Sequence, residues 1–87
     1  MSDYCYVYVL RSVTDKFFYV GFTKNLRSRL AAHNKGLVPS TRRRMPLELV
    51  YWEGSLNQTD ATVREKYLKS TWGKRYIKNR LRSYLTG

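Results

Sequence analysis

With 87 residues, 43% of them hydrophobic, the chain can bury one core but not two, so the sequence predicts a single domain over residues 1–87. Seventeen Lys and Arg against six Asp and Glu give a net charge of +11, which attracts nucleic acid or, as the main competitor, an anionic membrane surface, unless it serves solubility alone. The composition excludes a membrane-spanning helix, an internal disulfide and a Cys/His zinc site, and with no secretory signal at the N-terminus it predicts a cytoplasmic protein.

The first two predicted elements are strands joined by a short turn. Residues 4–10 are largely aromatic or β-branched, and period 2 places Tyr4, Tyr6 and Tyr8 on one face of a central strand. Cys5, Val7 and Val9 occupy the other face. Turn-forming residues follow at 13–16, and 17–22 form the second strand. So short a connection predicts an antiparallel hairpin.

A helix, a loop and a third strand follow. Thr23 or Asn25 can cap a helix over about residues 26–34, and Gly36 can end it. Residues 36–46 lack periodicity and predict a loop. The third strand covers residues 47–53 and ends near Gly54, with two glutamates at opposite strand parity, Glu48 and Glu53.

The C-terminal third is predicted to be helical. Thr59 or Asp60 caps a helix that runs to about Ser70, and Trp72–Gly73 interrupts it. The last helix covers about residues 74–85. Its apolar stripe is Ile77, Leu81, Tyr84 and Leu85. The whole sequence predicts an α+β fold of order β-β-α-β-α-α, with a small three-stranded, mainly antiparallel sheet flanked by helices.

Two tyrosines and two basic residues are candidates for a phosphodiester site. The hairpin brings the strands of Tyr8 and Tyr19 to about 4.8 Å, so these phenols can share one patch or simply form the edge of the core. Arg29 and His33 lie four residues apart and share a helix face. Arg29 suits a phosphate or a soluble helix surface equally. His33, the single histidine, is compatible with a structural, an exposed or a catalytic position.

Glu65 is the sole acidic residue between residues 61 and 87. A nucleic-acid-binding surface has little use for a carboxylate unless it holds a metal ion or orients a base. The alternative is an ordinary i,i+4 ion pair with Lys69. The residues alone do not choose between these two interpretations.

Basic side chains also gather outside this group. One set is Arg27 together with the run Arg42, Arg43 and Arg44. A second set, Lys74, Lys78 and Arg82, forms an i,i+4,i+8 row on the last predicted helix. A row of this kind can follow phosphates or can be a solvated helix face.

Taken together, these residues resemble the GIY-YIG nuclease superfamily, in particular its small bacterial stand-alone members. The first signature element is similar to Tyr6–Tyr8 and the second to Tyr19–Gly21. Arg29 falls eight positions past Gly21, where the family has its functional arginine. Residues 42–51 are similar to the approach to the third strand, and 61–69 to the helix with the metal-binding glutamate, which corresponds to Glu65.

The sequence departs from the family pattern at two places. Tyr6 stands where the first motif has glycine, which fills space near the site. The asparagine that the family often has late in the chain has one candidate, Asn79, which a helical projection places opposite the apolar stripe.

The resemblance implies a DNA endonuclease that hydrolyses a strand by in-line attack of water. Tyr8 or Tyr19 would take the proton from water, and Arg29 would stabilise the charge developing on phosphorus. Glu65 would hold Mg²⁺ or Mn²⁺, and His33 would orient the tyrosines or contact phosphate. A phenol has a pKa of about 10, so the basic surroundings would need to lower it for the site to work at neutral pH. We expect Tyr8, Tyr19, Arg29 and Glu65 to converge on one open concave patch, on the same side of the sheet.

The resemblance extends to the catalytic domain of excision-repair incision subunits, so DNA is favoured over RNA as partner. No small-molecule cofactor and no membrane are expected, and the protein is predicted to be a monomer or weak dimer. The second interpretation is a non-catalytic nucleic-acid-binding module on the same fold. The third is a membrane-surface or protein-interaction role for the basic last helix.

Overall fold

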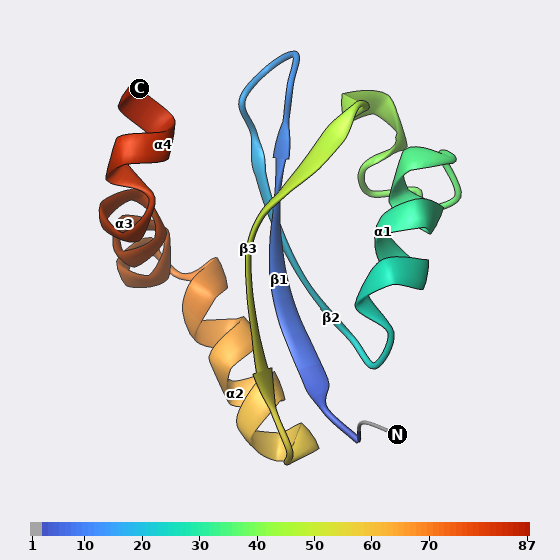
Figure 1. The fold of residues 1–87 in the computed structure, drawn as a ribbon, viewed down its shortest axis with the longest axis vertical. Helices are drawn as coiled ribbons and strands as arrows, with labels where there is room; N and C mark the ends of the chain where they lie inside the picture. The colour runs from blue at the N-terminus through green and yellow to red at the C-terminus, as the bar shows by residue number, and fades with distance from the viewer. Residues whose placement is uncertain (1–2) are drawn as a thin grey trace.

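The computed structural model describes residues 3–87 and consists of three layers, with the sheet between α1 on one side and α2, α3 and α4 on the other (Figure 1). Met1 and Ser2 lie outside the described residues. They belong to the predicted domain and to the N-terminus in which the sequence predicts no secretory signal. The elements are β1 (Cys5–Ser12), β2 (Phe18–Thr23), α1 (Leu26–Asn34), the 3-10 helix η1 (Arg42–Arg44), β3 (Leu47–Ser55), α2 (Gln58–Lys69), α3 (Thr71–Arg80) and α4 (Arg82–Thr86). This order confirms the predicted α+β fold.

The sheet has the order β2-β1-β3, and both strand pairs are antiparallel. Tyr8, in the central strand, pairs with Gly21 of β2 and with Trp52 of β3. Residues paired across neighbouring strands point to the same face, so these three residues share the face that α1 covers.

β3 contains a bulge at Val50, because Tyr51 pairs with Val9 whereas Leu49 already pairs with Leu10. The extra residue changes the side-chain alternation of the strand from that point. The prediction that the strand glutamates have opposite parity is therefore wrong. Both glutamates lie on the face of α2–α4, where Glu53 contacts Arg64 and Glu48 contacts Tyr84.

Apolar side chains fill both faces of the sheet. On the α2 side, alternate residues of β1 pack with the helices; the buried members are Cys5, Val7, Val9, Val20, Ala61, Leu68 and Ile77. On the α1 side the buried members are Tyr8, Leu10 and Leu47, with Leu26 and Leu30 of α1 against them. The predicted faces of β1 are confirmed. None of the helices within residues 3–87 is long and apolar enough to cross a membrane.

α1 has the predicted limits, and of the two candidate caps Asn25 is the one used, since its Oδ1 accepts from Ser28 N–H at 3.0 Å. Gly36 follows the helix with φ +74°, a left-handed conformation that suits glycine. η1 interrupts the predicted loop. Asn34 then holds the loop end, because its side chain bonds both the N–H and the C=O of Leu47 at 3.0 Å.

The helical C-terminal third differs from the prediction at its boundaries. α2 is capped by Asn57, and not by Thr59 or Asp60, because Asn57 Oδ1 accepts from the Asp60 N–H at 3.1 Å. α3 starts at Thr71, capped by Ser70, whose Oγ accepts from the Gly73 N–H at 3.2 Å.

Trp72 and Gly73 therefore lie in the first turn of α3, and the prediction that they interrupt a helix is wrong. A second break at Leu81 divides the predicted last helix into α3 and α4. Of its predicted apolar stripe, Ile77 is buried, whereas Tyr84 is 54% exposed and does not belong to the core.

Candidate active site

A chain of hydrogen bonds crosses the layer between β1 and α1. Tyr8 Oη lies 2.8 Å from His33 Nε2, and Arg29 donates from Nε to the same Oη at 3.3 Å. The second ring nitrogen of His33, Nδ1, lies 2.7 Å from Thr41 Oγ1. The chain Thr41–His33–Tyr8–Arg29 thus joins the loop before η1 to the central strand. Arg29 and His33 reach it together because they are one helical turn apart.

Gly21 makes room for this chain. It lies opposite Tyr8 on β2, and a Cβ atom built there would be 2.4 Å from Tyr8 Oη. The phenol ring therefore passes directly over the glycine backbone. Any larger residue would displace the hydroxyl from His33 and Arg29.

Burial controls protonation in the chain, since Tyr8 is 1% exposed and His33 is fully buried. Burial raises the pKa of Tyr8; the hydrogen bond from Arg29 opposes this, and the charges of Tyr19 and Glu65 add to it. Burial also lowers the pKa of His33, and the charge of Arg29 lowers it further. For Tyr8 the basic surroundings therefore do not give the lowered phenol pKa that activity at neutral pH would need. At neutral pH the phenol carries its proton and the imidazole is neutral.

This protonation state allows a continuous donor path. Arg29 has donors only, so Tyr8 Oη accepts from it and is left with its own proton to give. A neutral imidazole has one acceptor nitrogen. When Tyr8 donates a hydrogen bond to His33 Nε2, the imidazole proton resides on Nδ1, and Nδ1 donates a hydrogen bond to Thr41 Oγ1.

Tyr19 lies beside the chain and is half-buried. Its ring centroid is 5.1 Å from that of His33 and 6.3 Å from that of Tyr8. Tyr19 also packs against the α1-side core, as does Tyr8. These tyrosines therefore combine the core-edge position with a place at the site.

Glu65 comes from α2, on the other side of the sheet from α1 (Figure 1). Its Oε2 lies 3.1 Å from Lys69 Nζ, the i,i+4 pair that the spacing allows. Its carboxylate is nevertheless near enough to Tyr8 for its charge to raise the pKa of that phenol. Tyr8, Tyr19 and Arg29 come together on the α1 side, but Tyr8 is only 1% exposed, so they do not form the open patch expected from the sequence. Glu65 belongs to a helix on the other side of the sheet, so the expected placement on the same side is wrong, and its approach to the other three residues stays a prediction.

Thr41 belongs to the site but was not predicted. It is fully buried, and it follows His33 by eight residues through an irregular segment. Nothing in that segment has a period, so no sequence signal points Thr41 at an imidazole. A threonine before three arginines looks like any polar loop residue.

The predicted basic residues fall into different environments. Arg27 lines a hollow beside the site, and Arg42 and Arg43 are exposed on η1, next to Thr41. Arg44 is different, because it pairs with Asp15 and its guanidinium lies 3.8 Å above the Phe17 ring. Arg44 therefore fastens the loop to the β1–β2 turn.

The row on the C-terminal helices lies on the other side of the sheet. This row consists of Lys74, Lys78 and Arg82, and it borders a second hollow of about 520 Å³. Two further cations, Arg11 and Lys16, line the same hollow. Asn79, the candidate for the late family asparagine, is exposed and accepts from Arg82 at 2.9 Å. The structure brings neither this row nor Asn79 to Tyr8.

Comparison with known proteins shows the family of the chain. The sequence model of the family described as GIY-YIG catalytic domain matches residues 4–80 of this chain. A UPF0213 protein of Clostridium perfringens is 45% identical over 65 residues, which are 74% of this chain and 69% of the relative. One of Streptococcus pneumoniae is 39% identical over 79% of this chain and 70% of its own, and one of Pediococcus acidilactici 39% over 85% and 81%. No solved structure matches the chain.

The chain therefore belongs to the GIY-YIG catalytic domain family, a family of nucleases that act on nucleic acid. Within that family its relatives are the UPF0213 proteins, which are small and single-domain. The names of these relatives state no activity.

Proposed function

We propose that this protein is a divalent-metal-dependent endonuclease that hydrolyses phosphodiester bonds of DNA. The observation that carries the proposal is the hydrogen-bond chain Thr41–His33–Tyr8–Arg29, which places a phenol, a neutral proton acceptor and a fixed cation at one point. Family membership supports the nuclease class. The net charge of +11 supports a polyanionic substrate.

The proton path follows the hydrogen bonds of Tyr8, and the pKa shifts require its two proton transfers to occur together. Because Tyr8 does not ionise by itself at neutral pH, it accepts a proton from water as its own proton passes to His33 Nε2. The water oxygen forms a bond to phosphorus, the bond to the 3′ oxygen breaks, and that oxygen takes a proton from solvent to leave as a 3′ hydroxyl. His33 becomes a cation beside Arg29, whose charge disfavours that state, so the proton is readily released afterwards.

The other groups stabilise charge. Arg29, held against the Tyr8 hydroxyl, faces the negative charge that develops on the phosphate oxygens. Tyr19 borders the same space beside His33 and orients the attacking water.

A single carboxylate fits the implied metal. Mg²⁺ keeps several of its waters and is commonly held through one or two carboxylates together with substrate phosphates. Glu65 would hold it, with Lys69 displaced, and the bound ion supplies Lewis-acid stabilisation of the leaving oxygen. No group of three or more His, Cys, Asp and Glu that could form a closed metal site occurs among residues 3–87.

The test is strand cleavage in Mg²⁺ and Mn²⁺ on single-stranded, duplex and branched DNA. Glu65→Gln removes the anionic ligand with little change in volume, so cleavage should fall by about 100-fold or more. Binding measured in EDTA should persist or tighten, because one negative charge has been removed. Asp60→Asn, an exposed acid on the same helix, is the matched control.

Two outcomes would decide against parts of the proposal. Wild-type cleavage by Glu65→Gln would mean that Glu65 serves only as the partner of Lys69. Binding without cleavage of any substrate by the wild type would favour a nucleic-acid-binding module.

A further inference from the structure

Three aromatic rings that the proposed mechanism does not use form a shelf on the α1 side of the sheet: Tyr4, Tyr6 and Trp52. The ring centroids of Tyr6 and Trp52 are 5.7 Å apart at an interplanar angle of 67°, and those of Tyr4 and Tyr6 are 6.3 Å apart. Trp52 is 52% exposed and Tyr4 43%. Rings this exposed contribute little to a core and are typical of a binding surface.

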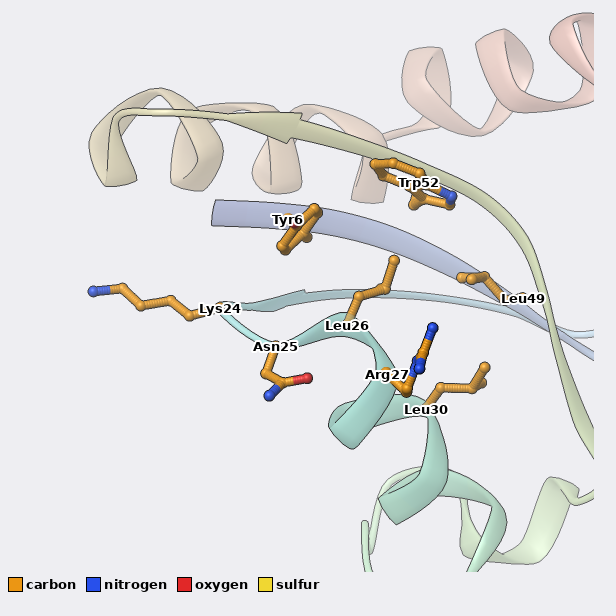
Figure 2. Close-up of a pocket in the computed structure, with 8 residues that line it drawn as sticks. All are labelled: Tyr6, Lys24, Asn25, Leu26, Arg27, Leu30, Leu49 and Trp52. Carbon is orange, nitrogen blue, oxygen red and sulfur yellow. The ribbon is translucent and has the colours of Figure 1, made fainter. Parts of the chain in front are cut away.

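The shelf borders a hollow of about 470 Å³ between β3 and the start of α1 (Figure 2). Leucines from both sides form its apolar floor: Leu26, Leu30 and Leu49. Arg27 points from α1 toward the strands, whereas Lys24 lies at the outer end and its side chain points away from the leucines (Figure 2). The lining contains two cations and no acidic side chain. Volume and lining fit a flat apolar ring attached to an anion.

The hollow adjoins the active site. Trp52 is the direct cross-strand partner of Tyr8, and Tyr6 is two residues from Tyr8 on the same face, about 6.6 Å along the strand. On α1, Arg27 points into the hollow while Arg29, two residues later, bonds Tyr8. A phosphate at Arg29 therefore has its neighbouring nucleotide beside the shelf.

We propose that the hollow binds one unpaired base of the nucleic acid, stacked on Trp52 and bordered by Tyr6, with the adjoining phosphate at Arg27. The placement beside the scissile phosphate rests on the proposed nuclease function. Aromatic stacking accepts any base, since every base has a flat π face. A base inside a continuous duplex is stacked on both sides and cannot enter. The favoured substrate is therefore a strand with unpaired nucleotides near the cut.

Charge argues against another occupant. A second copy of this chain would bring a further charge of +11 toward Lys24 and Arg27, with no acidic residue in the lining to receive it. A polyanion meets the opposite situation.

The experiment measures binding in EDTA, where no cleavage occurs. In a Trp72→Phe protein Trp52 is the single tryptophan, and its fluorescence should be quenched by a single-stranded oligonucleotide. Trp52→Ala should weaken single-strand binding about 5- to 150-fold and leave binding of a continuous duplex within about twofold. Trp52→Phe, which keeps a ring, should recover most of the affinity.

Trp72→Ala is the matched control, because Trp72 is 67% exposed on α3, on the other side of the sheet. The proposal is overturned if both alanine variants bind alike without quenching, if Trp52→Ala weakens duplex binding equally, or if it changes only self-association in sedimentation. If the oligonucleotide quenches Trp52 but the wild type cuts no substrate, the base-binding proposal stands and the proposed nuclease function is wrong. If the wild type cuts DNA but Trp52→Ala changes neither binding nor quenching, the nuclease function stands and the base-binding proposal is wrong.

Discussion

Tyr8 Oη has two partners in a buried place, so its removal tests chemistry and packing together. Tyr8→Phe keeps the ring and leaves His33 Nε2 without a partner. Cleavage should fall about 10²- to 10⁴-fold, the usual contribution of general acid–base catalysis. The free energy of unfolding should fall by about 1–3 kcal/mol, since a buried polar atom loses its hydrogen bond. Initial rates in Mg²⁺ and urea unfolding measure the two effects.

Tyr67→Phe is the control for that substitution, because the Tyr67 ring is 40% exposed on α2. It should leave both the rate and the stability unchanged. A Tyr8→Phe protein that is less stable yet cuts at the wild-type rate would show that the chain Thr41–His33–Tyr8–Arg29 is purely structural.

His33 predicts a pH dependence of stability. Burial and the charge of Arg29 hold its pKa in the folded protein below the ordinary value of about 6.5. Below that pH the unfolded chain binds a proton that the folded chain does not. The stability from this group is therefore complete above about pH 6.5 and is lost as pH falls through 6.5 toward the lower folded pKa.

The check is urea unfolding from about pH 7.5 to about pH 5.5, for the wild type and for His33→Gln, which does not titrate. The wild type should lose more stability over this range than the variant. Parallel losses would mean that groups other than His33 cause the acid sensitivity.

Among the elements, the junction of α2 and α3 depends on Gly73. Alanine in place of glycine in a helix normally stabilises by about 1 kcal/mol. Here a Cβ would lie 2.1 Å from the carbonyl oxygen of Tyr67 and 2.4 Å from Leu68 Cα, both backbone atoms. Gly73→Ala should therefore lower the free energy of unfolding, by about 1–3 kcal/mol. A urea midpoint above that of the wild type would show that the junction can open.

The elements that the sequence predicts well are those with local signals. Period 2 in β1 and the Asn25 cap with Gly36 after α1 depend on neighbours only. The bulge at Val50 does not, because it arises from the pairing of β3 with β1 and reverses which residues face α1. The predicted start of α2 is wrong because Asn57 is as good a cap as Thr59 or Asp60, and the sequence does not choose between them.

The same distinction applies to the site. Arg29 and His33 follow from helix spacing, and the family motifs point to both tyrosines. Thr41 was missed because only the folded loop brings it to His33. The raised pKa of Tyr8 could not be predicted from the sequence, because net charge says nothing about burial, which is its largest cause.

Across the whole molecule, the cations are divided between two sides of the sheet. Arg27, Arg42 and Arg43 lie on or after α1, on the side of the Tyr8 hydroxyl. The row on the C-terminal helices lies on the other side, around a hollow of about 520 Å³. A net charge of +11 therefore does not by itself say which side a nucleic acid contacts.

Salt dependence of binding distinguishes the roles within the arginine run. Each phosphate neutralised on duplex DNA contributes about −0.9 to the slope of log K against log salt. Arg42→Ser with Arg43→Ser removes two exposed cations beside the site, so the slope should flatten by up to about 1.8. Arg44→Ser should instead change the slope little and lower stability, because Arg44 binds Asp15 and covers Phe17. Titrations at several salt concentrations, with urea unfolding of each variant, measure both quantities. An unchanged slope in the double variant would place the bound phosphates elsewhere, and Lys74→Ser with Lys78→Ser would then be expected to flatten it.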